Sequence, residues 1–204
     1  MLSLTRVIAA PALALSLALS APAPLLAGTS DAKIETSIIA GSVKKSKQTK
    51  ASLYITAAEA AQVLAAREDV LLIDVRTPEE TILVGYPTAA DVNVPIALFD
   101  PQHKLNAKKG SYAMVPNPAF AGAVKTFLEG RDPSAVLVMC RSGGRSAKAV
   151  DALLKAGVEV PLYSVIDGFE GDKDANGKRA VNGWKNAGAA WTDKAGVGFL
   201  QGAQ

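Results

Sequence analysis

The chain has 204 residues, of which 49% are hydrophobic and 20% are charged, and this composition suffices for one globular domain with a hydrophobic core. The formal charge of +3 is too small an excess to indicate nucleic-acid binding. Aromatic residues make up only 5% of the chain, so no surface for base stacking is indicated either. The single cysteine, Cys140, excludes a disulfide within the chain.

The N-terminal segment has the pattern of a secretory signal peptide (1–27). Arg6 is followed by an Ala/Leu-rich run and then by small residues and prolines, with Ala27 as the last residue before cleavage. An uncleaved membrane anchor is the alternative, but the apolar run is short and contains Pro11. Cleavage removes Arg6 and lowers the formal charge from +3 to +2. We therefore expect an exported, periplasmic protein without stable membrane insertion.

Residues 28–50 follow the leader and show no hydrophobic period. Four lysines lie between Lys44 and Lys50, which indicates a flexible, solvated basic linker, with membrane-surface binding as the alternative. The globular domain is expected at 51–204, including a C-terminal insertion and tail from about residue 171.

Helical and apolar patterns alternate through this domain. Segment 55–67 is expected to be helical, because Thr56 and Glu59 fit a capping box and apolar residues recur on one face. Segment 69–75, "DVLLIDV", is a continuous apolar run that is typical of a buried parallel strand. The further predicted elements are a short helix or loop (76–85), a short strand (90–95), a long loop (98–116), a helix capped by Asn117 with Pro118 at its first position (117–130), a strand (134–139), a helix stopped by Gly157 (146–157) and a strand (161–167).

The alternation of strands and helices predicts an α/β domain with a mainly parallel sheet and helices on both faces. The loop from Asp100 to Asn117 is long for a compact domain, so we expect it to border a site.

Cys140 directly follows the apolar run "AVLVM", at the strand end where parallel sheets bind their ligands. Gly143 and Gly144 allow backbone conformations that other residues avoid, so the N–H groups of the loop can turn inward. Ser146 falls in the first turn of the next helix. A ring of amides and a helix N-terminus stabilise an anion at their centre, and the nearest anion is the thiolate of Cys140.

Two cations, Arg141 and Arg145, lie within five residues of the cysteine. Helix N-termini and nearby cations favour the thiolate form of a cysteine, which is the nucleophile. A buried, inert cysteine is the alternative, since cysteine is often buried. That alternative leaves the glycine pair and both arginines unexplained, so we favour a reactive Cys140.

Three segments, "LLIDVRTPEE", "VMCRSGGRSAKAVDALLKAG" and "LYSVIDGFEG", occur in this order and resemble the signature segments of single-domain rhodanese-like sulfurtransferases. The resemblance covers about 51–191. It implies a three-layer domain whose central, mainly parallel sheet has five strands, with helices on both faces. It also implies a reaction in which the cysteine attacks thiosulfate or another sulfane donor, becomes a persulfide, and passes the sulfur to cyanide, a thiol or a protein acceptor. Such a reaction requires no metal or organic cofactor.

The resemblance assigns roles to the whole loop after the strand. Cys140 is the catalytic nucleophile, and Arg141 and Arg145 hold the anionic donor and help sulfite leave. The amides that cradle the persulfide belong to Arg141, Ser142, Gly143, Gly144, Arg145 and Ser146.

Asp74 and Arg76 match the Asp-x-Arg signature of the family, and we expect them to be structural. Asp74 would accept backbone hydrogen bonds, and Arg76 would pair with Glu79 or Glu80. The family often has a Gly-His pair about ten residues further on, where this chain has Tyr86 instead of the histidine.

The spacing of the loop separates sulfur transfer from phosphate chemistry. Cys-based phosphatases space their cysteine and arginine as C-x5-R, whereas Arg145 gives C-x4-R here and Ser146 takes the place of the phosphatase arginine. The shorter loop fits a sulfur atom better, so a phosphatase or an arsenate reductase ranks below a sulfurtransferase. A non-catalytic sulfur carrier or partner-binding module is the other alternative, and the intact cysteine, glycines and arginines favour catalysis over it.

A second motif lies in the insertion. Asp172, Asp174, Asn176 and Gly177 reproduce the first half of a calcium loop, but its twelfth position is Gly183 rather than glutamate. Bound calcium is therefore one hypothesis and an ordinary turn is the other.

Three further residues need an explanation. His103 is the only histidine, so it forms no metal cluster with other histidines and is either a surface residue or part of a substrate loop. Trp184 and Trp191 are expected to pack the C-terminal tail over the domain.

Overall fold

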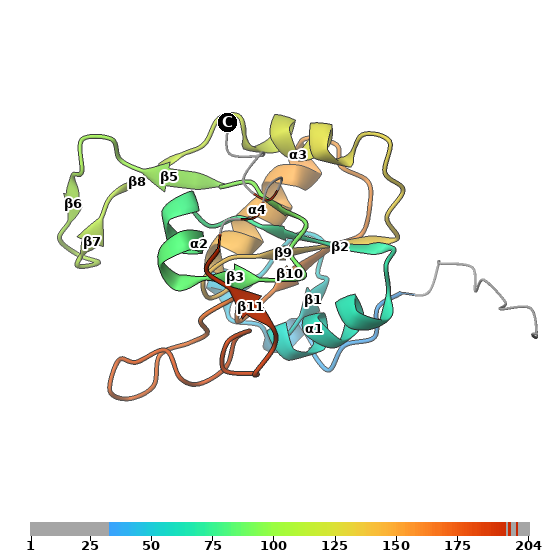
Figure 1. The fold of residues 1–204 in the computed structure, drawn as a ribbon, viewed down its shortest axis with the longest axis horizontal. Coiled ribbons are helices and arrows are strands. Elements are labelled where there is room, and N and C mark those ends of the chain that lie inside the picture. The colour runs from blue at the N-terminus through green and yellow to red at the C-terminus, as the bar shows by residue number, and fades with distance from the viewer. Residues whose placement is uncertain (1–32, 195, 197–198, 200–204) are drawn as a thin grey trace, which may run out of the picture.

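The computed structural model describes residues 33–194, 196 and 199, so the predicted signal peptide lies outside the described residues. In the described part of the chain, no helix combines the length and the apolar character that crossing a membrane requires. Figure 1 shows the arrangement of the helices and strands. In chain order they are η1 (Ala40–Ser42), η2 (Lys45–Lys47), β1 (Tyr54–Ile55), α1 (Ala57–Ala66), β2 (Val70–Asp74), α2 (Pro78–Val84), β3 (Tyr86–Pro87), β4 (Val92–Asn93), β5 (Ala97–Phe99), β6 (Leu105–Asn106), β7 (Ser111–Tyr112), β8 (Met114–Pro116), α3 (Phe120–Leu128), β9 (Ala135–Met139), α4 (Gly144–Lys155), β10 (Leu162–Val165) and β11 (Trp191–Thr192).

A five-stranded sheet forms the centre of the domain, in the order β1-β10-β9-β2-β4. Every neighbouring pair in it is parallel. The runs "VLLID" and "AVLVM" form β2 and β9, and they are almost fully buried because helices cover both faces of the sheet. The predicted α/β domain with a five-stranded sheet is thus confirmed, and the sheet is parallel throughout.

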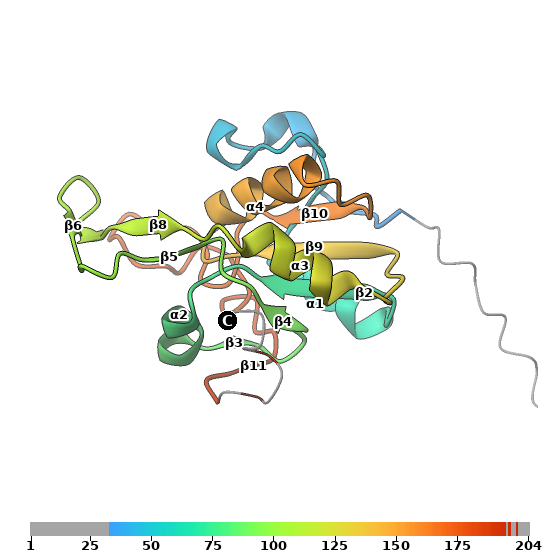
Figure 2. The ribbon, with the colours of Figure 1, turned by 90° about the horizontal axis from the view of Figure 1, so that it is seen from above.

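The hydrophobic core is divided by the sheet into two clusters. On one face, α3 and α4 contribute Phe120 and Leu153, which pack near Val138 of β9. On the other face, α1 contributes Ala60, which belongs to the same cluster as Leu137. Successive strand residues point to opposite faces, so β9 supplies both clusters at once. Figures 1 and 2 show this layering, with α3 and α4 on one side of the sheet and α1 on the other.

The helix starts follow the local capping rules. α1 begins with the predicted box, in which the Glu59 amide donates to Thr56 Oγ1 at 3.2 Å and the Thr56 amide donates to Glu59 Oε2 at 2.9 Å. α2 begins with a second box built from Thr77 and Glu80, with Pro78 in its first turn. The segment predicted as a short helix or loop is therefore a helix.

α3 begins later than the sequence predicts, at Phe120 rather than Pro118. The Asn117 side chain accepts a hydrogen bond from the Ala119 amide and donates one to the Pro95 carbonyl. These bonds hold a turn in front of the helix, so Asn117 precedes α3 without being its N-cap.

Residues 97–116 form an antiparallel ribbon that we call the arm. β5 pairs with β8, and β6 pairs with β7 nearer the tip. Figures 1 and 2 show the arm extending away from the body of the domain. The segment 98–116, which the sequence predicts as a long loop, therefore forms short paired strands instead. The strands are only two or three residues long, which is too short to show the alternation of apolar and polar residues that marks a strand in a sequence.

Residues 33–50 lie against the domain. Ile34 is 5% exposed and Val43 is 7% exposed, and η2 lies beside α4. The Lys47 ammonium pairs with the Asp172 carboxylate at 2.9 Å. The described part of this segment thus differs from the solvated linker predicted for 28–50, because single apolar residues anchor it without any regular period.

The C-terminal part returns to the domain through a second small sheet, in which β11 pairs with β3. Trp184 is 2% exposed, and its Nε1 donates to the Ala190 carbonyl at 2.9 Å. Trp191 packs so closely on Gly85 that a Cβ there would overlap the indole ring. Both tryptophans therefore pack the C-terminal part onto the domain, as the sequence predicts.

Candidate active site

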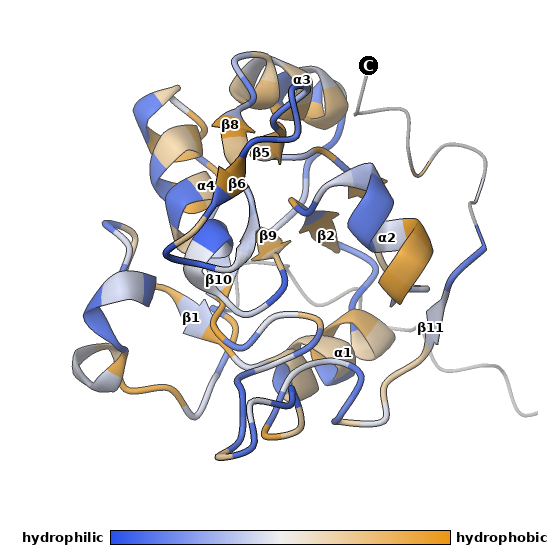
Figure 3. Ribbon diagram, turned by 90° about the vertical axis from the view of Figure 1, so that its left-hand side faces the viewer, coloured by the Kyte–Doolittle hydropathy of each residue, from blue (hydrophilic) through white to orange (hydrophobic). Residues whose placement is uncertain are grey.

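Cys140 follows the last residue of β9, at the carboxyl edge of the sheet. β9 lies between β10 and β2, so the cysteine is at the middle of this edge. Figure 3 looks onto the edge and shows α2 and α4 on either side of the strand ends. Cys140 is 1% exposed. We call residues 140–146 the active loop.

The backbone of the active loop turns toward the cysteine at Gly143. This residue has a φ of +95°, and its amide donates a hydrogen bond to Cys140 Sγ at 3.2 Å. A Cβ on Gly143 would overlap the Ile166 carbonyl oxygen, whereas a Cβ on Gly144 would meet nothing closer than the Ser46 carbonyl at 4.0 Å. Only the first glycine of the pair is therefore required by the geometry.

The twelve-residue helix α4 begins at Gly144, directly after the amide that contacts sulfur. The first turn of a helix presents N–H groups without intrahelical acceptors, and the helix dipole places positive potential there. The sequence predicts this arrangement, but α4 starts at Gly144, two residues before the expected Ser146. The loop therefore offers an anion both a direct amide contact and a helix N-terminus.

The turn after β10 holds the other side of the active loop. The Phe169 amide donates to the Cys140 carbonyl at 2.8 Å, and the Glu170 amide donates to the Arg141 carbonyl at 3.0 Å. Gly168 has a φ of +66°, and a Cβ on it would overlap the Cys140 carbonyl oxygen. The segment "GFEG" therefore fixes the backbone of the loop through direct backbone contact.

Arg145 is bound to a carboxylate of α2. Its two terminal nitrogens donate to the two Glu80 oxygens, each at 2.6 Å. Burial acts to lower the pKa of Arg145, but its pairing with Glu80, together with the charges of Cys140 and Asp74, outweighs burial and raises that pKa. Arg145 therefore stays a cation beside the cysteine, and the carboxylate of Glu80 balances its charge.

A second ion pair lies fully buried at the carboxyl end of β2. The Arg76 and Asp74 side chains meet at 2.5 Å, and both are 0% exposed. Arg76 also donates to the Gly85 carbonyl at 2.9 Å, and Asn93 Nδ2 donates to the carbonyls of both Asp74 and Arg76. The Arg76 guanidinium lies 4.2 Å from the centre of the Phe169 ring. These contacts fit the structural role predicted for the Asp-x-Arg pair.

The predicted partner of Arg76 is wrong. Arg76 pairs with Asp74, two residues before it, rather than with Glu79 or Glu80. Glu79 is exposed, and Glu80 faces Arg145. The Asp74 carboxylate also accepts the Arg76 backbone amide at 3.0 Å, which is the kind of contact that we predicted for it.

The remaining side chains of the loop differ in their surroundings. Arg141 Nε pairs with Glu170 at 2.6 Å, while its side chain stays 46% exposed. Ser142 is half-buried, whereas Ser146 is fully buried and its hydroxyl has no hydrogen-bond partner among the described residues. Both loop arginines, which we expected to hold the donor, thus already have a carboxylate partner.

Two cations near the loop were not found from the sequence. Lys47 lies beside Gly143 and pairs with Asp172, although 125 residues separate the two charges in the chain. Arg179, in the insertion, is close enough to Cys140 for the two charges to interact. No local motif marks either residue, so only the fold reveals them.

Tyr86 stands where the family often has a histidine, and it anchors the C-terminal tail. Its hydroxyl donates to the Lys194 carbonyl at 2.7 Å and accepts the Gly196 amide at 3.1 Å. Its ring stacks on Phe199 with 3.8 Å between ring centres. The residue is 5% exposed, so its role is packing of the tail.

The calcium candidates are engaged in other contacts. Asp172 pairs with Lys47, and Asp174 accepts the backbone amides of Asn176 and Lys178 at 2.9 and 2.8 Å. Among the described residues, no group of three or more acidic, histidine or cysteine side chains could hold a metal ion. The geometry therefore fits an ordinary turn, and calcium binding stays a prediction without support from these residues.

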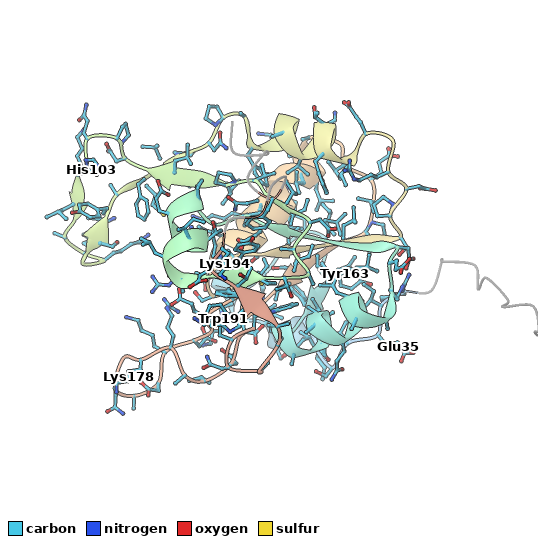
Figure 4. The ribbon with its side chains drawn as sticks, viewed as in Figure 1. Glu35, His103, Tyr163, Lys178, Trp191 and Lys194 are labelled. Carbon is cyan, nitrogen blue, oxygen red and sulfur yellow. The ribbon has the colours of Figure 1, made fainter. Side chains whose placement is uncertain are left out.

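His103 lies in the arm, where its ring packs edge-on against Tyr112 with 5.9 Å between ring centres. Figure 4 shows it near the tip of the arm, away from the body of the domain. No contact of His103 with Cys140 is present, so the surface position is the better description of this residue.

A cavity of about 880 Å³ lies away from the active loop. Its lining comes from the ends of α3 and α4 and from the residues just before β9 and β10, which belong to the amino edge of the sheet. No residue of the active loop takes part. The cavity is therefore separate from the candidate site around Cys140.

Comparison with known proteins agrees with this geometry. Residues 56–175, more than half of the chain, match the family described as "Rhodanese-like domain". The chain therefore belongs to the rhodanese-like family.

Individual relatives are similar over the same part of the chain. A crystal structure of Rv0390 from M. tuberculosis is 32% identical, with a TM-score of 0.51, and the match covers 69% of this chain and 96% of that one. The "Uncharacterized protein RP600" of Rickettsia prowazekii is 27% identical over 137 residues, which cover 67% of this chain and 94% of the relative. A Rhodopseudomonas palustris structure, described as a possible tyrosine phosphatase, is 20% identical with a TM-score of 0.39, and the match covers 67% and 82% of the two chains.

Proposed function

We propose that the protein is a sulfurtransferase that moves sulfane sulfur from thiosulfate or a related donor to a thiophilic acceptor through a persulfide on Cys140. The observation that carries the proposal is the contact between the Gly143 amide and Cys140 Sγ at the start of α4. A donor aimed at the sulfur, next to a helix N-terminus, stabilises the thiolate before the reaction and the terminal persulfide sulfur after it.

In the first step, the Cys140 thiolate attacks the outer sulfur of thiosulfate. A new S–S bond forms on the cysteine while the S–S bond of thiosulfate breaks, and sulfite leaves with the electron pair. The charges balance without an external oxidant or reductant. The product is a persulfide anion whose terminal sulfur lies among the loop amides.

In the second step, the acceptor attacks the terminal sulfur. Cyanide becomes thiocyanate, and a thiol, on a small molecule or a protein, becomes a persulfide. The bond between the two sulfur atoms on the cysteine breaks, and the Cys140 thiolate is restored. The reaction as written uses only this cysteine and the donors around it, with no metal or organic cofactor.

The persulfide is tested by measuring the intact mass of the protein after incubation with thiosulfate. We expect a gain of about 32 Da, the mass of one sulfur atom, which cyanide reverses. Cys140→Ser should show no gain, and His103→Gln, in the arm, should load like the wild type. Failure to load from several sulfane donors would rule out the enzyme.

The same assay distinguishes the alternatives. A sulfur carrier would load but would not turn over with cyanide or thiols in a steady-state assay. A partner-binding module would not load. Hydrolysis of an aryl phosphate or reduction of arsenate that depends on Cys140 would favour phosphate or arsenate chemistry instead.

We also propose that the protein works outside the cytoplasm, in the periplasm. The support is the leader pattern in residues 1–27, which lie outside the described residues. N-terminal sequencing of the protein from a secreting host should start at Gly28. A chain that keeps Met1 and stays in the cytoplasm would contradict export.

A further inference from the structure

Arg179 lies in the insertion, which we define as residues 171–184. Its Nη1 donates to the Gly171 carbonyl at 2.5 Å. The Gly171 amide in turn donates to the Arg141 carbonyl in the active loop at 3.3 Å. One glycine residue therefore connects the guanidinium of Arg179 to the backbone that carries Cys140.

The guanidinium of Arg179 uses only part of its hydrogen-bonding capacity. Its Nε is buried and has no hydrogen-bond partner among the described residues, and the bond to Gly171 is the one that the guanidinium makes within them. A guanidinium has five N–H donors, and a buried donor without an acceptor is unfavourable. The side chain as a whole is half-buried, so a small ligand can still reach it.

Several neighbouring charges, including that of Cys140, act on Arg179. Burial, followed by the positive charge of Arg141, lowers the pKa of Arg179, while Glu170, Asp172 and Cys140 oppose this change. Arginine nevertheless remains charged at any ordinary pH. The region beside the cysteine therefore holds a cation whose neighbours do not neutralise it fully.

The other cations around the loop are already paired. Arg141 pairs with Glu170, and Arg145 pairs with Glu80. Lys47 pairs with Asp172. Within the described residues, Arg179 has no carboxylate at ion-pair distance, which sets it apart from these three cations.

The insertion holds Arg179 in place from both ends. Lys173 and Arg179 form an antiparallel bridge, and the Asp174 amide donates to the Lys178 carbonyl at 2.7 Å. At the neck, Gly171 and Gly183 pack backbone to backbone so closely that a Cβ on Gly183 would overlap the Gly171 amide. A side chain fixed in this way loses little freedom when it binds a ligand.

We propose that Arg179 of the insertion, and not the carboxylate-paired arginines of the active loop, binds the anionic group of the sulfur donor. The proposal rests on the proposed function. The outer sulfur would face Cys140 while the charged oxygens accept hydrogen bonds from the guanidinium. Sulfite would then leave from a position next to a cation.

The first experiment measures binding without any sulfur transfer. Sulfate has the shape and charge of thiosulfate with oxygen in place of the outer sulfur, and Cys140→Ser cannot react. We expect calorimetric titration at constant ionic strength to show sulfate binding to Cys140→Ser, weakened about tenfold or more by adding Arg179→Gln. Lys178→Gln removes one positive charge from the next residue, whose side chain lies at the far end of the insertion in Figure 4, and should change the affinity by less than about twofold.

The second experiment measures turnover of the Cys140 enzyme with thiosulfate and cyanide. Arg179→Gln should raise KM about tenfold or more, and Arg179→Lys should recover part of the loss. No sulfate binding to Cys140→Ser, or equal effects of Arg179→Gln and Lys178→Gln, would overturn the proposal. Sulfate binding that depends on Arg179 in a protein that never forms a persulfide would contradict the proposed function and leave the anion site standing.

Discussion

The active loop and the insertion meet at the same edge of the sheet, but they are fixed in different ways. The loop is enclosed by backbone contacts, because Gly143 and Gly168 both pack without room for a Cβ. The insertion is tight only at its neck, and residues 175–178 at its tip are exposed. The backbone of the loop is thus fixed on every side, whereas the insertion carries Arg179 between a packed neck and an exposed tip.

Substitutions at the two glycines of the loop should give the largest change in the free energy of unfolding, and they test this difference directly. Gly143→Ala places a Cβ against the Ile166 carbonyl at a φ of +95°, so we expect a loss of about 2–4 kcal/mol in the free energy of unfolding and loss of persulfide loading. Gly144→Ala is the matched control. Gly144 is the first residue of α4, and its Cβ would meet nothing closer than the Ser46 carbonyl at 4.0 Å, so the same free energy should rise by about 0.5 kcal/mol. Urea unfolding measures both, and equal effects would contradict the tight packing at Gly143.

This pair of glycines also shows what the sequence can reveal. The runs "VLLID" and "AVLVM", the glycine turn and the helix after it are local patterns, and they correctly predict the sheet and the place of Cys140. Which glycine is required depends on Ile166, a residue more than twenty positions away. The sequence contains no signal for that contact.

The partners of the charged residues could not be predicted for the same reason. The sequence offers several carboxylates as partners for Arg76 and Arg145. Only the fold determines that Arg76 pairs with Asp74 and that Arg145 pairs with Glu80. Arg179 could not be identified from the sequence because no local motif marks it. The arm was missed because its short strands lack a hydrophobic alternation.

The ion pair of the loop gives an intermediate effect that depends on pH. Burial acts to raise the pKa of Glu80, but Arg145, the Thr77 amide and Arg76 outweigh it and lower that pKa below the ordinary 4.5. The pair therefore contributes stability that is fully present above about pH 4.5 and is lost as the pH falls through the lowered pKa. We expect Glu80→Gln to cost about 1–2 kcal/mol of unfolding free energy at pH 7.

The same measurement repeated near pH 3 separates charge pairing from packing. The difference between the wild type and Glu80→Gln should shrink there, because below about pH 4.5 the unfolded chain binds a proton at Glu80 more readily than the folded protein does. Glu79→Gln is the matched control, because Glu79 is the exposed neighbour of Glu80 in the same helix. A difference that stays constant between pH 7 and pH 3 would show that the pair acts through shape alone.

The contact between Lys47 and Asp172 gives the smallest effect, and it tests how firmly the insertion is tied to the domain. The two side chains are 12% and 32% exposed. Burial acts to raise the pKa of Asp172, and the hydrogen bond and charge of Lys47 outweigh it and lower that pKa. A pair so close to solvent should contribute only about 0.5–1 kcal/mol.

A double-mutant cycle isolates this contribution. Lys47→Met keeps the aliphatic stem that lies beside Gly143, and Asp172→Asn keeps the shape of the carboxylate. The coupling in unfolding free energy should be about 0.5 kcal/mol or more at low salt and should decrease at about 1 M salt, where exposed charges are screened. Persulfide loading should change little, because the pair lies outside the active loop. A coupling as large and as insensitive to salt as that of a buried pair would mean that the insertion is fixed as firmly as the loop.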